Sequence, residues 1–451
     1  MPNSKHRRHH FGLEPLLCPE RASSQARAVP TEPQSRLRTL GVDPASWMAA
    51  LPDHVRLDTL YLPGTHQSLA LNYPLASSLC QTTTLTAQLR GGIRCLDLRF
   101  ALIRDDKHGG KPTLWAYHGV VPQGREMSQV LREVYAWLES PEGRRETVVI
   151  SIKQENAGHE FAARVWELID STRPYMWYDR DVWPTLGQVR GRCVMFCRFG
   201  FDSGRGLHPP IWPNDKPYPW RTEVGGRETI VQDWYGVRSP LSIPDKARLV
   251  LSLFDSSSAV FAAPHKPVIP SSHAGAGTTP SSPDAEEAAD STVAVVPFRI
   301  NFLSCGTFPT LYPSHAAKGF GAPSLGIGYR GVNQLVCVGL DRLDRSRRSG
   351  EQLGSAETEA GVLLLPRTRQ EAQPGQVSRE EEDEEEEEKR SILARAPASS
   401  RLPSGAERAA VASGGGRRRR EGQGGMLVLM DFWESPRGRD SLVDRIVEMN
   451  F

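Results

Sequence analysis

The chain has 451 residues and carries 55 Lys and Arg against 53 Asp and Glu, a formal net charge of +2 at pH 7. This near balance argues against a strongly basic surface, so we expect no nucleic-acid partner. We find no apolar run long enough for a membrane span or a signal peptide. The composition therefore predicts a cytoplasmic protein or one that contacts a membrane peripherally, and secretion stays open only if the chain begins elsewhere.

Three segments have compositions that cannot bury enough apolar surface to offset the chain entropy lost on folding. Residues 1–40 are rich in Arg and Pro, residues 264–291 in Pro, Ser, Ala and His, and residues 344–424 carry the runs EEEDEEEEEKR and SGGGRRRR. We predict that all three are disordered. The rest, over 41–451, suffices for one barrel-sized domain interrupted twice, which we expect to be monomeric.

Eight β-rich runs alternate with helical patterns, which is typical of a parallel sheet with crossover helices. Apolar residues recur at helical spacing over 128–140 and 440–450, which predicts two of the outer helices. Eight strands favour an α/β fold closed as a TIM barrel, (β/α)8. The predicted strands are 56–62, 92–100, 113–118, 146–153, 192–199, 228–233, 297–304 and 425–432.

The cysteines are odd in number and lie mostly inside apolar strand-like runs, without the short paired spacings of a zinc site. We expect them to be reduced core residues, and we expect no metal or other cofactor. They are Cys18, Cys80, Cys95, Cys193, Cys197, Cys305 and Cys337.

Polar residues follow the predicted strands, and in a TIM barrel the carboxyl ends of the strands carry the active site. Each of these residues alone has an ordinary structural explanation, such as a hydrogen-bonded histidine or an ion pair closing the barrel. Together they supply a base, an acid and cations, which suits cleavage of a phosphodiester. The residues are His66, Asp97, Arg99, His118, Lys153, Glu155, Arg198, Asp233 and Asp431.

The ordered motifs LPGTHQS, GIRCLDLRF, YHG, ETVVISIKQE, VRGRCVMFCRF and IVQDWYG together resemble the bacterial-type phosphatidylinositol-specific phospholipases C and their fungal relatives. The likeness runs from about Trp47 to Phe451 without the insertions, and GMLVLMDFWESP with NFLS looks most like the fungal branch. It implies a distorted TIM barrel. It also implies that the inositol 2-hydroxyl attacks phosphorus, giving diacylglycerol and inositol 1,2-cyclic phosphate.

The resemblance also implies roles for individual residues. His66 matches the general base, Asp431 the carboxylate that orients it, and His118 the general acid. Arg99 matches the arginine that holds the phosphate, where calcium-dependent relatives carry a metal ligand, so the implied enzyme is metal-independent. Substrate-binding positions are matched by Asp97, Lys153, Glu155, Arg198 and Asp233, with Tyr235 stacking on the inositol ring.

Position 67 departs from the pattern, because relatives usually carry Asp directly after the first histidine and this chain has Gln67. An amide cannot carry the negative charge that would raise the pKa of a neighbouring histidine. Restoring a carboxylate there should then improve protonation of the leaving group. Two alternatives follow: a pseudoenzyme that binds a lipid head group without turnover, or another phosphodiesterase on the same scaffold, which would require acidic metal ligands at the strand ends.

The implied substrate, phosphatidylinositol or a glycosyl-phosphatidylinositol, lies in a bilayer, so the barrel mouth needs apolar side chains at the interface. Trp and Tyr suit that depth. The stretch PPIWPNDKPYPWR, with Trp212, Tyr218 and Trp220, is the predicted rim, and the alternative is a packed Pro-rich loop.

Overall fold

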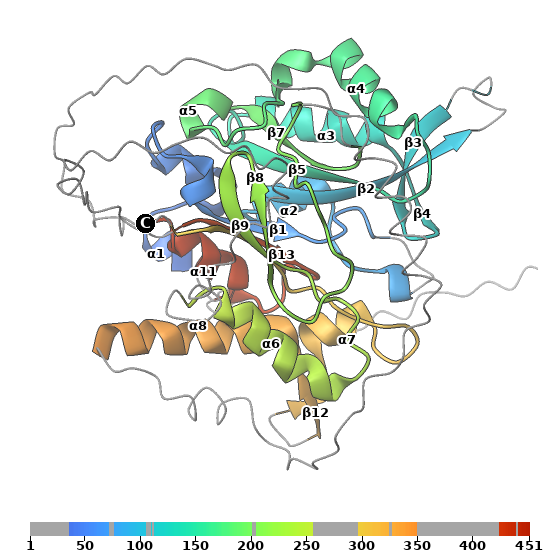
Figure 1. The fold of residues 1–451 in the computed structure, drawn as a ribbon. Coiled ribbons are helices and arrows are strands. Elements are labelled where there is room, and N and C mark those ends of the chain that lie inside the picture. Colours follow the sequence, from blue (N-terminus) through green and yellow to red (C-terminus); the bar gives the residue numbers. More distant parts are fainter. Residues whose placement is uncertain are drawn as a thin grey trace, which may run out of the picture.

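Parallel strands run through the centre of the molecule, with helices on either side of them (Figure 1). The structure, a computed structural model, describes residues 36–71, 76–104, 110, 112–200, 204–255, 296–323, 327–349, 424–438 and 441–451. Within these ranges eight consecutive neighbours in one sheet are parallel, in the order β6-β7-β5-β2-β1-β13-β10-β9. The predicted α/β barrel class is therefore confirmed.

The sheet is curled but its hydrogen bonding does not close. In order, the strands are β6 (Trp177–Tyr178), β7 (Arg192–Arg198), β5 (Thr147–Gln154), β2 (Cys95–Arg104), β1 (Tyr61–Thr65), β13 (Met426–Met430), β10 (Phe298–Phe302), β9 (Arg227–Gln232) and the antiparallel β8 (Trp220–Val224). In the described part of the chain the two end strands, β6 and β8, do not pair with each other. The expectation of a closed barrel was wrong in this respect, and the barrel is a distorted one.

One predicted barrel strand lies elsewhere. The run 113–118 falls in β3 (Pro112–His118), which pairs antiparallel with β2 and continues into β4 (Val121–Glu126) as a hairpin beside the barrel. The eighth parallel strand is β6, whose two residues are too short to leave a pattern. The first strand also begins later than predicted, because residues Leu57–Thr59 form a turn of 3-10 helix before β1.

Helices pack on both sides of the sheet. The two predicted helices are confirmed as α3 (Met127–Glu139) and α11 (Leu442–Glu448), each with a buried apolar face. The further helices are α2 (Leu85–Arg90), α4 (Phe161–Thr172), α5 (Leu186–Val189), α6 (Ile243–Ser252), α7 (Pro313–Lys318) and α8 (Val332–Ser349). All residues of β1, β10 and β13 are buried, as expected for central strands of a parallel sheet covered on both faces.

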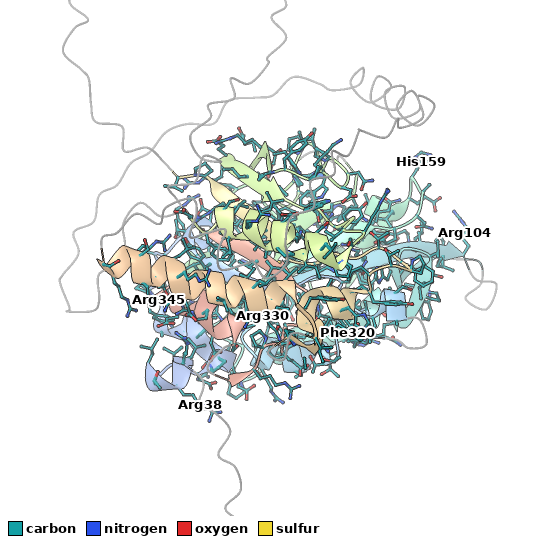
Figure 2. All side chains as sticks on the ribbon, turned by 90° about the horizontal axis from the view of Figure 1, so that it is seen from below. Arg38, Arg104, His159, Phe320, Arg330 and Arg345 are labelled. Atoms are coloured by element: carbon teal, nitrogen blue, oxygen red, sulfur yellow. The ribbon has the colours of Figure 1, made fainter. Side chains whose placement is uncertain are left out.

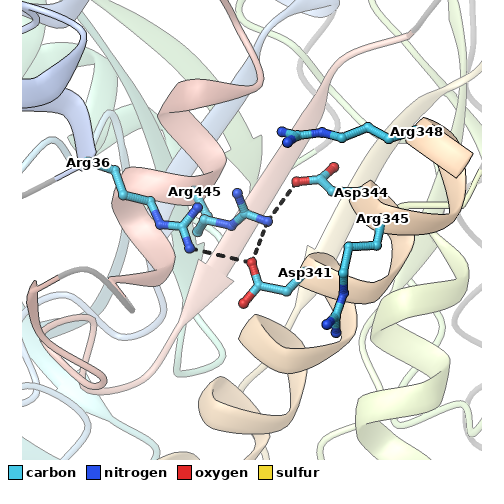
Figure 3. A pocket seen from close by; sticks show the side chains of 6 residues that line it. All are labelled: Arg36, Asp341, Asp344, Arg345, Arg348 and Arg445. Atoms are coloured by element: carbon cyan, nitrogen blue, oxygen red, sulfur yellow. Dashed lines mark hydrogen bonds and ion pairs between the residues drawn. The ribbon is translucent and has the colours of Figure 1, made fainter.

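Two predicted disordered segments were drawn too long. Residues Arg36–Thr39 form α1, and its Leu37 is fully buried, so the N-terminal boundary at 40 is wrong. Helix α8 continues through Ser349, and its Asp344 pairs with Arg445 of α11 at 2.7 Å (Figure 3), so the second boundary at 344 is also wrong. Both boundaries were misplaced because the charged residues of these helix ends resemble the charged segments next to them in composition. Residues 264–291, and the rest of the other two segments, lie outside the described residues.

The cysteine prediction holds for the residues described. Six cysteines are buried and unpaired by disulfides: Cys80, Cys95, Cys193, Cys197, Cys305 and Cys337. Cys18 lies outside the described residues.

At the amino ends of the strands a buried ion pair ties the barrel together. Arg94, just before β2, contacts Glu146, just before β5, with 2.7 Å between Arg94 Nη2 and Glu146 Oε2, and both side chains are fully buried. Glu146 also accepts hydrogen bonds from the backbone of Met48 and Ala49, and Arg94 donates to backbone carbonyls. We call this pair and its partners the base cluster.

Candidate active site

A cavity of about 1220 Å³ opens at the carboxyl ends of the parallel strands. Two of the predicted site residues, Gln67 and Asp97, lie behind its wall, 2 % and 0 % exposed. The structure thus gathers the predicted residues around one cavity. Those that line it are His66, Arg99, His118, Lys153, Glu155, Arg198, Asp233, Tyr235 and Asp431.

His66 and Asp431 meet because their strands are neighbours in register. Thr65, the last residue of β1, lies opposite Met430, the last residue of β13, so the next residue of each strand lies beside the other. His66 Nδ1 is 2.7 Å from Asp431 Oδ1. An ionised carboxylate only accepts hydrogen bonds, so Nδ1 carries the proton and Nε2 is left to accept another.

Asp97 and Arg99 lie within β2 and not at its end, contrary to the prediction. β2 pairs with β5 up to Phe100 and with β3 from Phe100 onward, so the barrel part of the strand ends at Phe100, just after Arg99. Arg99 Nη2 lies 3.0 Å from Asp97 Oδ2, and its Nη1 lies 3.4 Å from Glu155 Oε1. Burial would lower the pKa of Arg99, but these two carboxylates raise it well above its usual value. Arg99 is therefore a fixed cation.

Asp97 stays ionised in spite of its complete burial. Burial raises the pKa of its carboxyl, but the nearby Arg99 and Arg198 outweigh that effect and hold it well below its usual range. The backbone N–H of Gln67 also donates to Asp97 Oδ2 at 3.1 Å. Asp97 thus acts as a buried anion that fixes the cations around it.

The side chain of Gln67 faces Arg99. Arginine has donors only, so the amide turns its oxygen toward the guanidinium, 3.2 Å from Nε and 3.0 Å from Nη1. The residue has a φ of 45°, in the left-handed region, which turns the chain immediately after His66. The hydrogen bonds of Gln67 therefore hold the guanidinium of Arg99, a role that the sequence argument, centred on His118, did not foresee.

His118 reaches the cavity from an unexpected direction. It is the last residue of β3, and because β3 runs antiparallel to β2, the hairpin carries it back toward Arg99. Its Nδ1 donates to the backbone carbonyl of Ser78 at 3.1 Å and lies 3.9 Å from Cys80 Sγ. Burial, and then the neighbouring His66, lower the pKa of His118.

The remaining charged residues form the part of the cavity wall that adjoins Arg99 and Asp97. Arg198 lies between two carboxylates, 3.5 Å from Asp97 Oδ1 and 3.7 Å from Asp233 Oδ2. Lys153 Nζ lies 3.6 Å from Glu155 Oε1, and burial, followed by the charge of Arg99, lowers the pKa of Lys153 to about 8. This wall offers both cationic donors and anionic acceptors to a ligand.

The predicted aromatic rim was wrong for both tryptophans. Trp220 is 9 % exposed, and Trp212 lies under Arg198, whose guanidinium carbon is 4.0 Å from the ring centroid, while its indole N–H donates to Asp233. The two rings pack edge to face, as the packed-loop alternative has it, and Trp212 also lines the cavity. Tyr218 from the same stretch is exposed. The exposed apolar residues that line the cavity are Ile211, Tyr235 and Phe308.

Sequence reasoning missed Ser78 and Cys80 as parts of the site, and it placed Trp212 on a membrane-facing rim instead of under Arg198. Ser78 acts through its backbone carbonyl, which no residue type reveals, and Cys80 lies in a segment without a recognisable motif.

In the described ranges, no helix combines the length and apolarity needed to cross a membrane.

Comparison with known proteins identifies relatives in sequence. No family model matches the chain. Over 201 residues it is 28 % identical to the 1-phosphatidylinositol phosphodiesterase of Listeria monocytogenes, an alignment that covers 42 % of this chain and 57 % of that protein. With the 1-phosphatidylinositol phosphodiesterase of Staphylococcus aureus strain Newman it shares 24 % identity over 214 residues, 44 % of this chain and 66 % of the relative. The chain therefore spans less than two thirds of the length of either relative.

The fold has a solved counterpart. A structure of the phosphatidylinositol-specific phospholipase C of S. aureus superposes with a TM-score of 0.52 at 16 % identity, covering 91 % of this chain and 98 % of that one. At this identity the superposition is evidence for the fold. The chain thus resembles the bacterial phosphatidylinositol-specific phospholipases C in sequence and shares their distorted TIM-barrel fold.

Proposed function

We propose that this protein is a phosphatidylinositol-specific phospholipase C that works without a metal ion. The observation that carries the proposal is the His66–Asp431 pair, which shares one cavity with His118 and the partly buried Arg99. A base oriented by a carboxylate, a second histidine and a fixed cation are the groups that phosphodiester cleavage requires.

In the proposed reaction the inositol 2-hydroxyl gives its proton to Nε2 of His66 as its oxygen bonds to phosphorus. The bond between phosphorus and the glycerol oxygen breaks, and protonated His118 supplies the proton that this oxygen needs. The products are diacylglycerol and inositol 1,2-cyclic phosphate. Asp431 holds the tautomer of His66 and stabilises its cationic form, as the carboxylate of a hydrolytic triad does.

Arg99 supplies the positive charge for the phosphate oxygens. It is held by Asp97, Glu155 and Gln67, so its guanidinium is oriented before substrate binds. A preorganised donor costs no rearrangement in the transition state. The neutral Gln67 adds no third carboxylate to Asp97 and Glu155, so more of the positive charge of Arg99 is available to the phosphate.

The charged wall suits the inositol ring, whose hydroxyl groups both donate and accept hydrogen bonds. Lys153 and Arg198 would donate, Glu155 and Asp233 would accept, and the 40 % exposed Tyr235 lies at the cavity edge where a ring can stack. The cavity is larger than the roughly 300–1,000 Å³ of ordinary small-molecule sites. We therefore include glycosyl-phosphatidylinositol among the proposed substrates.

We propose peripheral membrane contact through Ile211 and Phe308, which are 54 % and 67 % exposed at the cavity. Changing Phe308 to Ser should weaken binding to phosphatidylinositol-containing vesicles. The matched control is Val182→Ser, 46 % exposed in the segment after β6 and absent from the cavity lining. Equal vesicle binding by both variants would reject this rim.

The roles of the two histidines are tested by the leaving group. His118→Ala should lose about 10²- to 10⁴-fold in turnover of phosphatidylinositol, the usual worth of a positioned acid or base. A substrate with a good leaving group needs little protonation, so the same variant should be much less impaired on it. His66→Ala should be impaired on both substrates. Equal losses for His118→Ala on both would contradict its role as general acid.

A further inference from the structure

His66, Cys80 and Asp431 form a cluster that the proposed reaction uses only in part. One ligand atom from each, a ring nitrogen, the Sγ and a carboxylate oxygen, lies within 4.8 Å of the other two. All three residues line the cavity, so the cluster is reachable from outside although Cys80 and Asp431 are buried. The proposed chemistry gives the Cys80 thiol no role.

We propose that these three side chains form an inhibitory binding site for a soft divalent cation, with Zn²⁺ as the best-suited ion. Zn²⁺ prefers four tetrahedral ligands drawn from Cys, His and Asp or Glu, at about 2.0–2.3 Å. Donor atoms of one tetrahedral site lie about 3.5 Å apart, so small side-chain shifts would suffice, and His66 Nδ1 and Asp431 Oδ1 would move apart from 2.7 Å if Nδ1 is the ligand. The fourth position would face the cavity and take water. The word inhibitory rests on the proposed function, whereas the binding site itself does not.

Binding of the ion would prevent His66 from acting as the general base, whichever ring nitrogen is the ligand. On Nε2 of His66 the ion occupies the lone pair that should accept the substrate proton. On Nδ1 it displaces the proton shared with Asp431, and the neutral ring then carries its proton on Nε2. The thiol of Cys80 gives up its proton to solvent on binding, because the thiolate is the ligand. In each case His66 can no longer act as a base.

The same cluster should reject hard cations. Ca²⁺ takes six to eight oxygen ligands and Mg²⁺ a near-octahedral oxygen set. The cluster offers one carboxylate, and sulfur and imidazole ligands favour Zn²⁺ and its soft neighbours. The site therefore predicts selectivity for Zn²⁺ and Co²⁺ over Ca²⁺ and Mg²⁺.

Binding is tested on the full-length protein with Co²⁺ as a spectroscopic probe. We expect a sulfur-to-cobalt charge-transfer band and the visible bands of a four-coordinate ion, both removed by Zn²⁺. Cys80→Ser should lose the charge-transfer band. Cys305→Ser, a change at another buried cysteine of the same cavity, should keep it. A band that persists in folded Cys80→Ser, or no band in the wild type, would overturn the site.

Inhibition is tested separately by turnover of phosphatidylinositol with added Zn²⁺. Cys80→Ser should raise the concentration for half inhibition at least about 10-fold, the lower end of what loss of a supporting group costs a metal site. Ca²⁺ and Mg²⁺ should not inhibit, and Cys305→Ser should respond like the wild type. Equal Zn²⁺ inhibition of both variants, or activation by Zn²⁺, would overturn the assignment. If the protein has no turnover at all, the proposed function fails, and the cobalt spectrum still decides the site.

Discussion

Both ends of the barrel contain buried ion pairs, but the pairs differ in how completely their atoms are hydrogen-bonded. In the base cluster, Arg94 and Glu146 are fully buried, and each also hydrogen bonds to backbone groups. At the mouth, Arg198 and Asp97 face each other at 3.5 Å, and neither Arg198 Nη1 nor Asp97 Oδ1 makes a hydrogen bond within the described part of the chain. The mouth also borders the large cavity.

This difference separates stability from function. Charges whose hydrogen bonds are complete hold strands and loops in place, and removing one partner leaves the other buried and uncompensated. Incompletely hydrogen-bonded charges at the border of a cavity mark a candidate functional site. We therefore expect substitutions in the base cluster to reduce stability and substitutions at the mouth to reduce turnover.

The largest expected effect is on stability, from Glu146→Gln. Loss of one partner of a buried pair typically costs about 3–5 kcal/mol, because the charge of Arg94 would remain without its counterion. Chemical denaturation measures this loss. The control is Glu142→Gln, whose exposed pair with Arg90 should contribute less than about 1 kcal/mol. Similar stability of the two variants would show that the base cluster does not hold the fold together.

Next comes Arg99→Lys, which should lower turnover about 10²- to 10³-fold, as removal of one preorganised donor does. A lysine cannot reproduce the planar fork that meets the phosphate and the Gln67 oxygen together. Steady-state kinetics with a parallel unfolding measurement checks this. Arg104→Lys, near the outer end of the same strand (Figure 2), should be normal. A loss of stability that matches the loss of turnover would place Arg99 with the structural pairs.

The pH dependence should show two losses of kcat/KM as pH rises. His118 must be protonated to act as an acid, and its lowered pKa puts the first loss below the ordinary histidine value of about 6.5. Lys153 is cationic only below its pKa of about 8, so the second loss should occur there. Lys153→Arg should remove the second step and keep the first. Persistence of a step near pH 8 in that variant would exclude Lys153 as its source.

The smallest expected effect concerns Gln67→Asp. Because the structure places this side chain on Arg99, a carboxylate there would neutralise part of the charge that binds phosphate, in addition to Asp97. We now expect KM to rise by less than about 10-fold, equally for substrates with good and poor leaving groups. This reverses the expectation from sequence alone. A gain in turnover confined to the poor leaving group would restore the original view that position 67 serves His118.

The expectation that polar residues lie at strand ends located much of the site, because neighbouring parallel strands end side by side. His66 and Asp431, far apart in sequence, were both placed at the barrel mouth this way, and the family resemblance paired them. His118 was assigned to the right cavity but the wrong kind of strand, since an antiparallel hairpin leaves the same short β-rich run as a barrel strand. Ser78 contributes a backbone carbonyl, and Trp212 was predicted to face the membrane because tryptophan suits that interface, whereas packing places it under Arg198. Contacts made by backbone atoms, or decided by packing, have no signal in residue type.

The most direct test of the account is the water-soluble product formed from inositol-labelled phosphatidylinositol with EDTA present. Intramolecular attack supported by His66, His118 and Arg99 predicts that inositol 1,2-cyclic phosphate appears first and that chelation does not reduce its rate. Loss of turnover on chelation with rescue by Ca²⁺ would contradict the metal-independent mechanism. A linear inositol phosphate as the first product would contradict the cyclic one, and no product from the folded protein would contradict the proposed catalysis.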